Sequence, residues 1–412
     1  MGSKASLLEG ELGSITLANV AKAGRFVDLF SGSGAVGNFV AENADIPVLS
    51  ADLQEYARVF SASVIERTAS LVGNAILHEW ILPELEKERL SQISNLTPDA
   101  VWQMRQDAAS EGNGFICRDY GGHYYSLSQA RTLDRLHDSL PVEEPERTVA
   151  MAALLDAASA CAAAPGHTAQ PFQPTSSLLR HIKSSWSKDI ATTVYSAISK
   201  ISPVYAKQRG QSVVRSAESL ATTLNDSDLV FLDPPYSAVQ YSRFYHVLEG
   251  IARGGWPKIE GKGRAPSLNE RPASEFSMRS KARSAMNDLL KNLRERGCDV
   301  IITFPEAEAS NGLSGTEIAK MASDAWFVEV QYLNSVHSTL GGSNAIGLRG
   351  SRRKLTESVI VLRPKINQSV ISAPSSSARG GSNALDLLPQ MPESGRVSTF
   401  TGGTSVQKFV ST

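Results

Sequence analysis

The sequence predicts an α/β fold built on an open, mostly parallel sheet, and three observations support this prediction. Short apolar segments have the length and composition of buried strands, at residues 25–30, 47–50, 229–232 and 299–304. Helical stretches separate these segments, as connections between parallel strands require. Residues suited to chemistry follow two of the segments directly, at the edge where open α/β sheets bind their ligands.

The most informative of these residues are Asp233-Pro234-Pro235-Tyr236, which follow the apolar run 229–232. They match the needs of methylation at the exocyclic amino group of a nucleobase. The lone pair of that nitrogen is delocalised into the ring, so catalysis must come from positioning and from acceptors that favour a more tetrahedral nitrogen. Asp233 offers an ionised acceptor, and Pro235 fixes the direction of the Pro234 carbonyl, a second one. Tyr236 offers a flat face for an extruded base. The alternative, an ordinary surface turn, is disfavoured by the strand before the motif and the Tyr within it.

A glycine-rich loop follows the first predicted strand. Residues 31–37 read SGSGAVG, and glycines there allow a tight turn and close approach of the backbone to a ligand before a helix that begins near Ala35. Asp52 follows the second predicted strand, 18 residues after Gly34, and is suited to bind ribose hydroxyls. The combination indicates a cofactor that contains adenosine.

The same spacing of Gly32, Gly34 and Gly37 also fits a dinucleotide-binding fingerprint, so an NAD-dependent oxidoreductase is the rival interpretation. Asp28, just before the glycines, favours a cationic methyl donor. A carboxylate there attracts the ammonium of S-adenosylmethionine, whereas it would repel a pyrophosphate.

With these motifs the chain resembles the adenine-N6-specific DNA methyltransferases, in which the glycine loop precedes Asp-Pro-Pro-Tyr. The resemblance is carried by residues 2–8 (GSKASLL), 28–34 and 233–249, which anchor roughly the first 80 residues and the region from about 210 to 365. It implies a Rossmann-like S-adenosylmethionine-dependent methyltransferase sheet with an inserted, mainly helical target-recognition domain.

The resemblance also implies roles for particular residues. In that family the N-terminal Gly-Ser-Lys segment helps to close the cofactor pocket, and the glycine loop and the acid after the second strand bind S-adenosylmethionine. Leu53 would pack on the adenine ring of the cofactor. The implied cofactor-binding set is Gly2, Ser3, Lys4, Asp28, Phe30, Gly32, Gly34, Asp52, Leu53 and Asp233. One departure stands out: the position of an acid that members often carry before the motif falls at Arg215, with Glu218 nearby as a substitute.

The resemblance further implies that Asp233 and the Pro234 carbonyl hold the target amino group while Tyr236 stacks on a flipped adenine of a double-stranded DNA site. A cognate restriction endonuclease would be a partner. Asp at the first motif position favours adenine in DNA, because related RNA and protein-glutamine enzymes usually carry Asn there and cytosine-N4 enzymes Ser. An RNA methyltransferase of similar layout and a catalytically inactive DNA-binding module remain alternatives.

Composition narrows the class of protein. The 412 residues are 42% hydrophobic, which is enough for a sizeable core. Apolar runs of membrane-spanning length and a signal peptide are absent from the sequence, so we expect a cytoplasmic protein with no membrane partner. The three cysteines are far apart, and neither they nor the seven histidines have the spacing of metal ligands, so we expect no metal.

The net charge of −1 argues against DNA binding by the whole surface, but two basic clusters are candidates for phosphate contacts. In both, a merely solvated face is the alternative. The first comprises Arg180, Lys183, Lys188, Lys200, Lys207, Arg209 and Arg215, and the second Arg349, Arg352, Arg353 and Lys354.

The organisation of the chain follows from these features. We expect residues 1–75 to form the cofactor-binding half and residues 213–365 the catalytic half of a methyltransferase domain. The roughly 135 residues between them are too many for a simple connection, so residues 76–212 should form the inserted helical domain. Two strands around Val328 and Ile360 would close the sheet as a hairpin, joined by a long connection at 332–357. Residues 254–277 read as a loop near the substrate, and 366–412 as a disordered tail.

Overall fold

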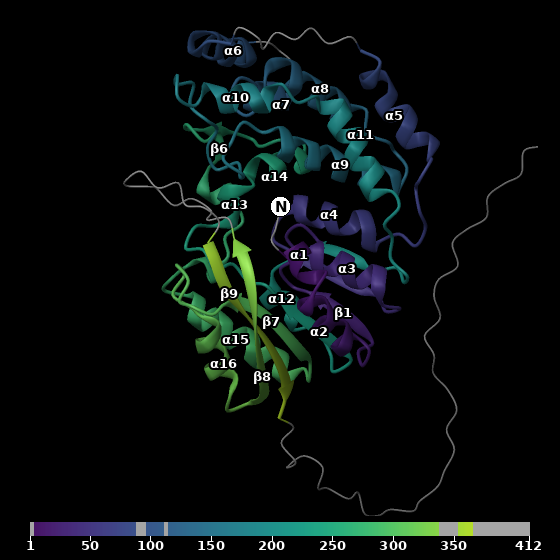
Figure 1. The fold of residues 1–412 in the computed structure, drawn as a ribbon, viewed down its shortest axis with the longest axis vertical. Coiled ribbons are helices and arrows are strands. Elements are labelled where there is room, and N and C mark those ends of the chain that lie inside the picture. The colour runs from purple at the N-terminus through teal and green to yellow at the C-terminus, as the bar shows by residue number, and fades with distance from the viewer. Residues whose placement is uncertain (1–3, 88–95, 111–113, 338–352, 366–412) are drawn as a thin grey trace, which may run out of the picture. The chain divides into compact units, whose positions relative to one another are not determined.

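The computed structural model describes residues 4–87, 96–110, 114–337 and 353–365 (Figure 1). Seven strands form one sheet in the order β3-β2-β1-β4-β7-β9-β8. Neighbouring strands pair in parallel from β3 to β7, and β9 is antiparallel to both of its neighbours. The predicted α/β class and the closing hairpin are confirmed. The strands are β1 (Arg25–Asp28), β2 (Val48–Asp52), β3 (Gln211–Val214), β4 (Asp228–Leu232), β7 (Asp299–Pro305), β8 (Trp326–His337) and β9 (Arg353–Pro364).

The sheet is covered on both faces because its strands are apolar on both sides. In β4 all five residues are buried, with Leu229 and Phe231 on one face and Val230 and Leu232 on the other. The first face packs against α1 (Lys4–Leu8), α2 (Glu11–Val20) and α3 (Ala35–Asn43). The second packs against α12 (Ala217–Ala221), α15 (Ala282–Glu295) and α16 (Gly315–Ala322).

The strand order reverses between β1 and β4. From β1 the chain adds strands outward through β2 to β3, whereas from β4 it adds β7 and the hairpin on the other side. At such a reversal the connections leave the two strands in opposite directions, which opens a crevice at their carboxyl ends. The glycine loop follows β1 and Asp233 follows β4, so both predicted motifs flank this crevice.

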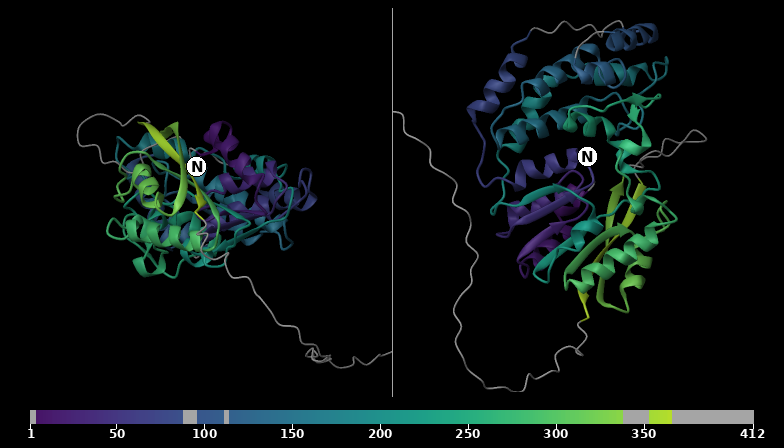
Figure 2. Two further views of the ribbon diagram at one scale, coloured as in Figure 1. Left: turned by 90° about the horizontal axis from the view of Figure 1, so that it is seen from below. Right: turned by 180° about the vertical axis from the view of Figure 1, so that it is seen from behind.

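The segment between β2 and β3 is helical, as predicted, but its core is continuous with the rest of the chain. The buried face of α4 (Glu55–Ile65) and that of α14 (His246–Arg253) share one apolar cluster with α9 and α11. Residues 1–365 form one compact unit that contains the predicted boundaries at 75 and 212, and those boundaries stay a prediction. The helices are α5 (Ala75–Leu85), α6 (Pro98–Ser110), α7 (Phe115–Tyr120), α8 (Leu127–Asp138), α9 (Glu146–Cys161), α10 (Leu179–Trp186) and α11 (Ile190–Ile201). Figure 2 shows this helical region from two further sides.

Local contacts set the ends of several elements. Helix α4 ends at Ile65, where the buried guanidinium of Arg67 bonds to the carbonyls of Ala69, Ile201 and Val204. A break at Tyr245 separates α13 (Tyr241–Phe244) from α14. The hairpin strands are longer than expected, because the pairing of β8 and β9 continues as far as His337 and Arg353. The tail from 366 lies outside the described residues.

Residues 254–277, expected as a loop, carry local structure of their own. They contain the short pair β5 (Ile259–Glu260) and β6 (Ala265–Pro266), and two 3-10 turns, η1 (Leu268–Glu270) and η2 (Glu275–Ser277). The side chain of Phe276 is buried and meets the ring of Phe30 edge to face, with centroids 5.1 Å apart. We call residues 254–277 the β5–β6 segment.

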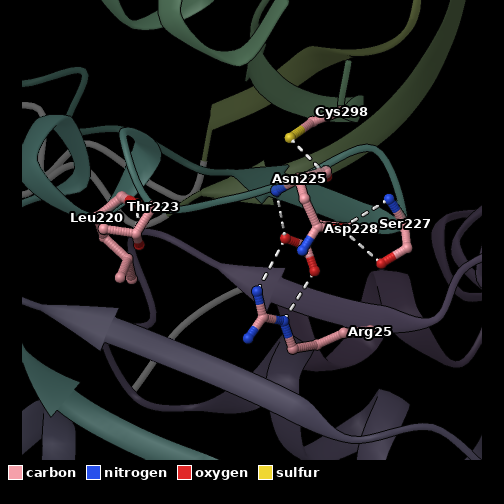
Figure 3. A network of polar contacts seen from close by, with 7 residues as sticks. All are labelled: Arg25, Leu220, Thr223, Asn225, Ser227, Asp228 and Cys298. Atoms are coloured by element: carbon pink, nitrogen blue, oxygen red, sulfur yellow. Dashed lines mark hydrogen bonds and ion pairs between the residues drawn. The ribbon is translucent and has the colours of Figure 1, made fainter. Parts of the chain in front are cut away.

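An ion pair joins the amino ends of β1 and β4 (Figure 3). The Arg25 guanidinium donates through Nε and Nη2 to the two carboxylate oxygens of Asp228, at 2.8 Å each. Asp228 also accepts from the backbone N–H of Asn225 at 2.9 Å, and the Asn225 carbonyl accepts from the thiol of Cys298 at 3.2 Å. The network therefore fastens the two central strands at the end opposite the predicted site.

Candidate active site

A cavity of about 720 Å³ opens at the carboxyl ends of β1, β2 and β4. Most of the residues predicted to bind cofactor or substrate line it: Lys4, Asp28, Phe30, Gly32, Asp52, Leu53, Asp233, Pro235 and Tyr236. Gly34 and Pro234 are buried behind this wall. Gly2 and Ser3 lie outside the described residues. The structure thus brings together two motifs that are about 200 residues apart in sequence.

The glycine loop owes its shape to positions that only glycine fits. Gly34 has φ +75° and precedes α3, and Gly32 has φ +51°, a backbone conformation that side chains disfavour. At Gly37 a Cβ atom would lie 2.7 Å from Ser50 Oγ. The loop can therefore turn tightly and hold its backbone close to a ligand.

Two carboxylates line the cavity beside the glycine loop, of which Asp28 is buried and Asp52 half-buried. Asp28 accepts from the Phe30 N–H at 3.2 Å, and burial raises the pKa of its carboxyl to about 7. Asp52 accepts from the N–H groups of Gly32 and Gln54, at 3.0 and 3.1 Å, and burial raises its pKa to about 6. Asp233, across the cavity, adds to the upward shift of the Asp28 pKa.

These residues fit S-adenosylmethionine better than a dinucleotide. The three carboxylates Asp28, Asp52 and Asp233 face one cavity and favour a ligand with positive charge over a pyrophosphate. Two polar atoms next to the cavity, Ser31 Oγ and Gln54 Oε1, are buried and make no hydrogen bond within the described part of the chain. Buried polar atoms favour a partner, and a polar ligand would provide one.

Asp233 is held by two groups from distant parts of the chain. Its Oδ1 accepts from the Thr303 hydroxyl of β7 at 3.0 Å and lies 3.2 Å from Lys4 Nζ. The Lys4 ammonium also pairs with Glu357, a buried residue of β9. Lys4 was predicted to close the cofactor pocket. It lines the cavity and also contacts the motif acid, where burial lowers the pKa of its ammonium and Asp233 partly offsets that effect.

The rest of the motif is fixed by the loop after β7. Asn311 donates from Nδ2 to the carbonyl of Pro235 at 2.9 Å, and Ser310 donates to that of Tyr236 at 3.4 Å. The carbonyl of Pro234 accepts from no donor within the described ranges. Pro234 is not among the residues that line the cavity, so its role as the second acceptor stays a prediction.

Aromatic rings form the wall beside the motif acid. Tyr236, Tyr241, Tyr245 and Tyr56 all line the cavity. Tyr236 is hydrogen-bonded to Tyr241, and burial raises the pKa of the Tyr236 phenol to about 12, so it is neutral at physiological pH. The rings of Tyr245 and Tyr56 lie 5.4 Å apart. Tyr245, at the break between α13 and α14, packs against the helical core and also lines the cavity.

Sequence reasoning missed Thr303, Glu357, Asn311 and Tyr56. Thr303 is a polar residue within the apolar run of β7, and such a residue at the carboxyl end of a central strand is a usable signal. No local pattern distinguishes Glu357 or Asn311, because their roles depend on contacts across the sheet. Arg215 and Glu218 both line the cavity; Arg215 donates its backbone N–H to the Asp52 carbonyl at 2.9 Å, and its side chain bonds to Ser219.

Only part of the two basic clusters lies within the described residues. Of the first, Arg215 lines the cavity, and the others are spread along α10, α11 and the following loop. Arg349 and Arg352 of the second lie outside the described residues, as do the side chains of Arg353 and Lys354. Three large aromatic residues of the helical segment, Tyr124, Tyr125 and Trp186, are core residues with at most 2% exposure.

Within residues 4–87, 96–110, 114–337 and 353–365, no group of three or more His, Cys, Asp or Glu side chains could hold a metal ion. In the same ranges, none of the helices has the length and apolar character needed to span a bilayer.

The parallel sheet, the glycine loop after β1 and the Asp233–Tyr236 motif after β4 place the chain in the class of Rossmann-like methyltransferases. Residues 196–303 match the family model of the D12 class of N6 adenine-specific DNA methyltransferases. This part of the chain is therefore similar to that family, which agrees with the resemblance predicted from the motifs.

Two curated relatives with matching segments are modification methylases. The chain is 29% identical over 140 residues to modification methylase LlaI of Lactococcus lactis subsp. lactis, a match that covers 34% of this chain and 21% of that protein. It is 34% identical over 67 residues to modification methylase StsI of Streptococcus sanguinis, covering 16% of this chain and 10% of that protein. The chain thus spans about a fifth and a tenth of the length of these relatives.

Proposed function

We propose that this protein transfers a methyl group from S-adenosylmethionine to the N6 amino group of adenine in a double-stranded DNA site, by base flipping. The observation that carries the proposal is the cavity itself. Asp28 and Asp52, beside the glycine loop, line the same cavity as Asp233 and Tyr236. A cofactor site and a base site therefore share one space, as direct transfer between two bound molecules requires.

Different residues would bind the cofactor and the target base. Asp28 and Asp52 would hold the ammonium and ribose ends of S-adenosylmethionine, which supplies the methyl group when bound. Asp233 accepts one hydrogen bond from the adenine amino group, and the Pro234 carbonyl accepts another, which favours the tetrahedral nitrogen of the transition state. Tyr236 stacks on the flipped base, whose extrusion costs a few kcal/mol.

Lys4 and Thr303 act on Asp233 rather than on the substrate. They contact the same carboxylate oxygen, Oδ1, so Oδ2 is left to face the substrate. Both donate to Asp233 and so fix the orientation of its carboxylate. The pair Lys4–Glu357 also ties the N-terminal helix to β9 next to the motif. We therefore regard Lys4 and Thr303 as positioning residues.

The direct test is transfer of a labelled methyl group from S-adenosylmethionine to mixed-sequence duplex DNA, with RNA and protein acceptors in parallel. Label recovered as N6-methyladenine in DNA is the expected result. Label in RNA or protein alone would overturn the substrate while keeping the cofactor site. Cofactor binding without transfer to any acceptor would instead favour the inactive DNA-binding module.

Cofactor affinity should depend on pH through Asp28. Because the pKa of its carboxyl is about 7, the fraction ionised rises from about one-tenth at pH 6 to about nine-tenths at pH 8. Only the ionised form attracts the ammonium, so affinity should rise about tenfold over this interval. Calorimetric titration of the wild type and of Asp28→Asn checks this.

The Asp28→Asn variant should bind weakly with little change between pH 6 and 8, while the exposed Asp45→Asn control should follow the wild type. The same carboxyl should affect stability with the opposite sign. Between about pH 4 and 7 the ligand-free native state keeps a proton on Asp28 that the unfolded chain has lost, so the free energy of unfolding should fall as pH rises. An equal pH response in wild type and Asp28→Asn would contradict this assignment.

A further inference from the structure

Two segments far apart in sequence are joined at the mouth of the cavity. The Gln240 side chain donates to the Ser274 carbonyl at 2.9 Å and accepts from the Ser274 N–H at 2.8 Å. This double hydrogen bond ties the start of α13 to the β5–β6 segment. Both segments contribute to the cavity wall, through Tyr241 and Ser242 on one side and Pro272 and Ser274 on the other.

An arginine lies three residues from this joint on each segment. Arg243 is exposed on α13, between the cavity-lining residues Ser242 and Tyr245. Arg271 directly precedes Pro272. The two guanidinium groups are close enough that the charge of Arg243 contributes, after burial, to lowering the pKa of Arg271.

No acid neutralises this pair. Within the described part of the chain, neither Arg243 nor Arg271 forms an ion pair with a carboxylate, and Arg271 Nε is buried without a hydrogen-bond partner. The neighbouring acids are engaged elsewhere: Glu270 caps the turn at Ser267, and Glu275 pairs with Lys281. Two like charges held together without a counter-ion are unfavourable, so the arrangement suits an anionic ligand.

The surroundings of Arg243 and Arg271 indicate which anion the two side chains would bind. Three acids, Asp28, Asp52 and Asp233, line the interior of the cavity and would repel a free anion. A nucleotide whose base occupies the cavity leaves its backbone phosphates outside, at the mouth. Guanidinium groups bind phosphate oxygens by paired, charge-assisted hydrogen bonds.

We propose that Arg243 and Arg271 form a phosphate-binding site that grips the DNA backbone next to the flipped adenine. The inference rests on the proposed function for the identity of the nucleotide, and it adds a DNA contact that lies in neither basic cluster recognised from the sequence. Because the site lies on the two segments that Gln240 and Ser274 join, it would hold the target strand while the base enters the cavity.

The test measures binding of the full chain to a fluorescently labelled mixed-sequence duplex as a function of salt. Arg243→Gln and Arg271→Gln should each weaken binding about tenfold near physiological salt and reduce the slope of log K against log salt by about 0.9. The double variant should lose about twice that slope. Arg243→Lys and Arg271→Lys keep the charge and should keep the slope.

Arg296→Gln is the matched control, because Arg296 is exposed at the end of α15, near the amino end of β7 and far from the strand ends that carry the site. It should match the wild type. Affinity for S-adenosylmethionine should be unchanged in every variant, which shows that each is folded.

The outcomes separate this inference from the proposed function. Unchanged affinity and slope in the double variant would refute the phosphate site even where DNA is methylated. Loss of slope in a protein that binds duplex DNA but transfers no methyl group to it would support the site and refute the proposed function. Failure of the wild type to bind duplex DNA would overturn both.

Discussion

Replacement of Asp233 by alanine should reduce methyl transfer to DNA at least about 100-fold, in line with the loss of a preorganised group that acts in the transition state. The carboxylate is the ionised acceptor at the base end of the cavity, and no other described acid lies within the motif. Lys4 keeps Glu357 as a partner in the variant, so the fold should persist. Single-turnover transfer rates, with cofactor affinity measured in parallel, check the prediction.

Two further variants serve as comparisons for Asp233→Ala. Asp233→Asn keeps the shape and one acceptor oxygen but loses the charge, so its rate should fall between those of the wild type and Asp233→Ala. Asp226→Ala removes an exposed carboxylate just before β4, away from the cavity, and should leave the rate unchanged. Near-normal turnover in Asp233→Ala would contradict the proposed mechanism.

Replacement of Asp228 by alanine should lower the free energy of unfolding by about 3 kcal/mol without direct effect on the cavity. Breaking a buried ion pair typically costs about 3–5 kcal/mol, and we expect the lower end because the Arg25 side chain is 33% exposed. The variant also leaves the Asn225 N–H without its acceptor (Figure 3). Denaturant titration monitored by circular dichroism measures the change.

The matched comparison is again Asp226→Ala, which should change stability by less than about 0.5 kcal/mol because that side chain is exposed and forms no ion pair within the described residues. Asp228→Asn keeps an acceptor for Asn225 and should cost less than Asp228→Ala. If all three variants unfolded at the same denaturant concentration as the wild type, the network would have no role in fastening β1 to β4.

The fold class and both motifs were predictable from the sequence because they rest on local patterns. Apolar runs in β1, β2, β4 and β7 predicted a buried parallel sheet, and the two motifs follow strands whose ends meet at one edge. β3 was missed, because its four residues are only partly buried and their apolar content is low.

The sequence by itself determined that a glycine loop with acids and an Asp-Pro-Pro-Tyr motif would share one sheet edge, because each motif directly follows an apolar strand and the carboxyl ends of parallel strands lie at the same edge. Only the tertiary structure decided the partners of Asp233. Lys4 and Glu357 are separated by 353 residues, and they meet because β9 inserts next to β7. The pairing of Arg243 with Arg271 likewise depends on the Gln240–Ser274 joint. Contacts of this kind arise from the packing of whole elements, so no short-range pattern in the chain encodes them.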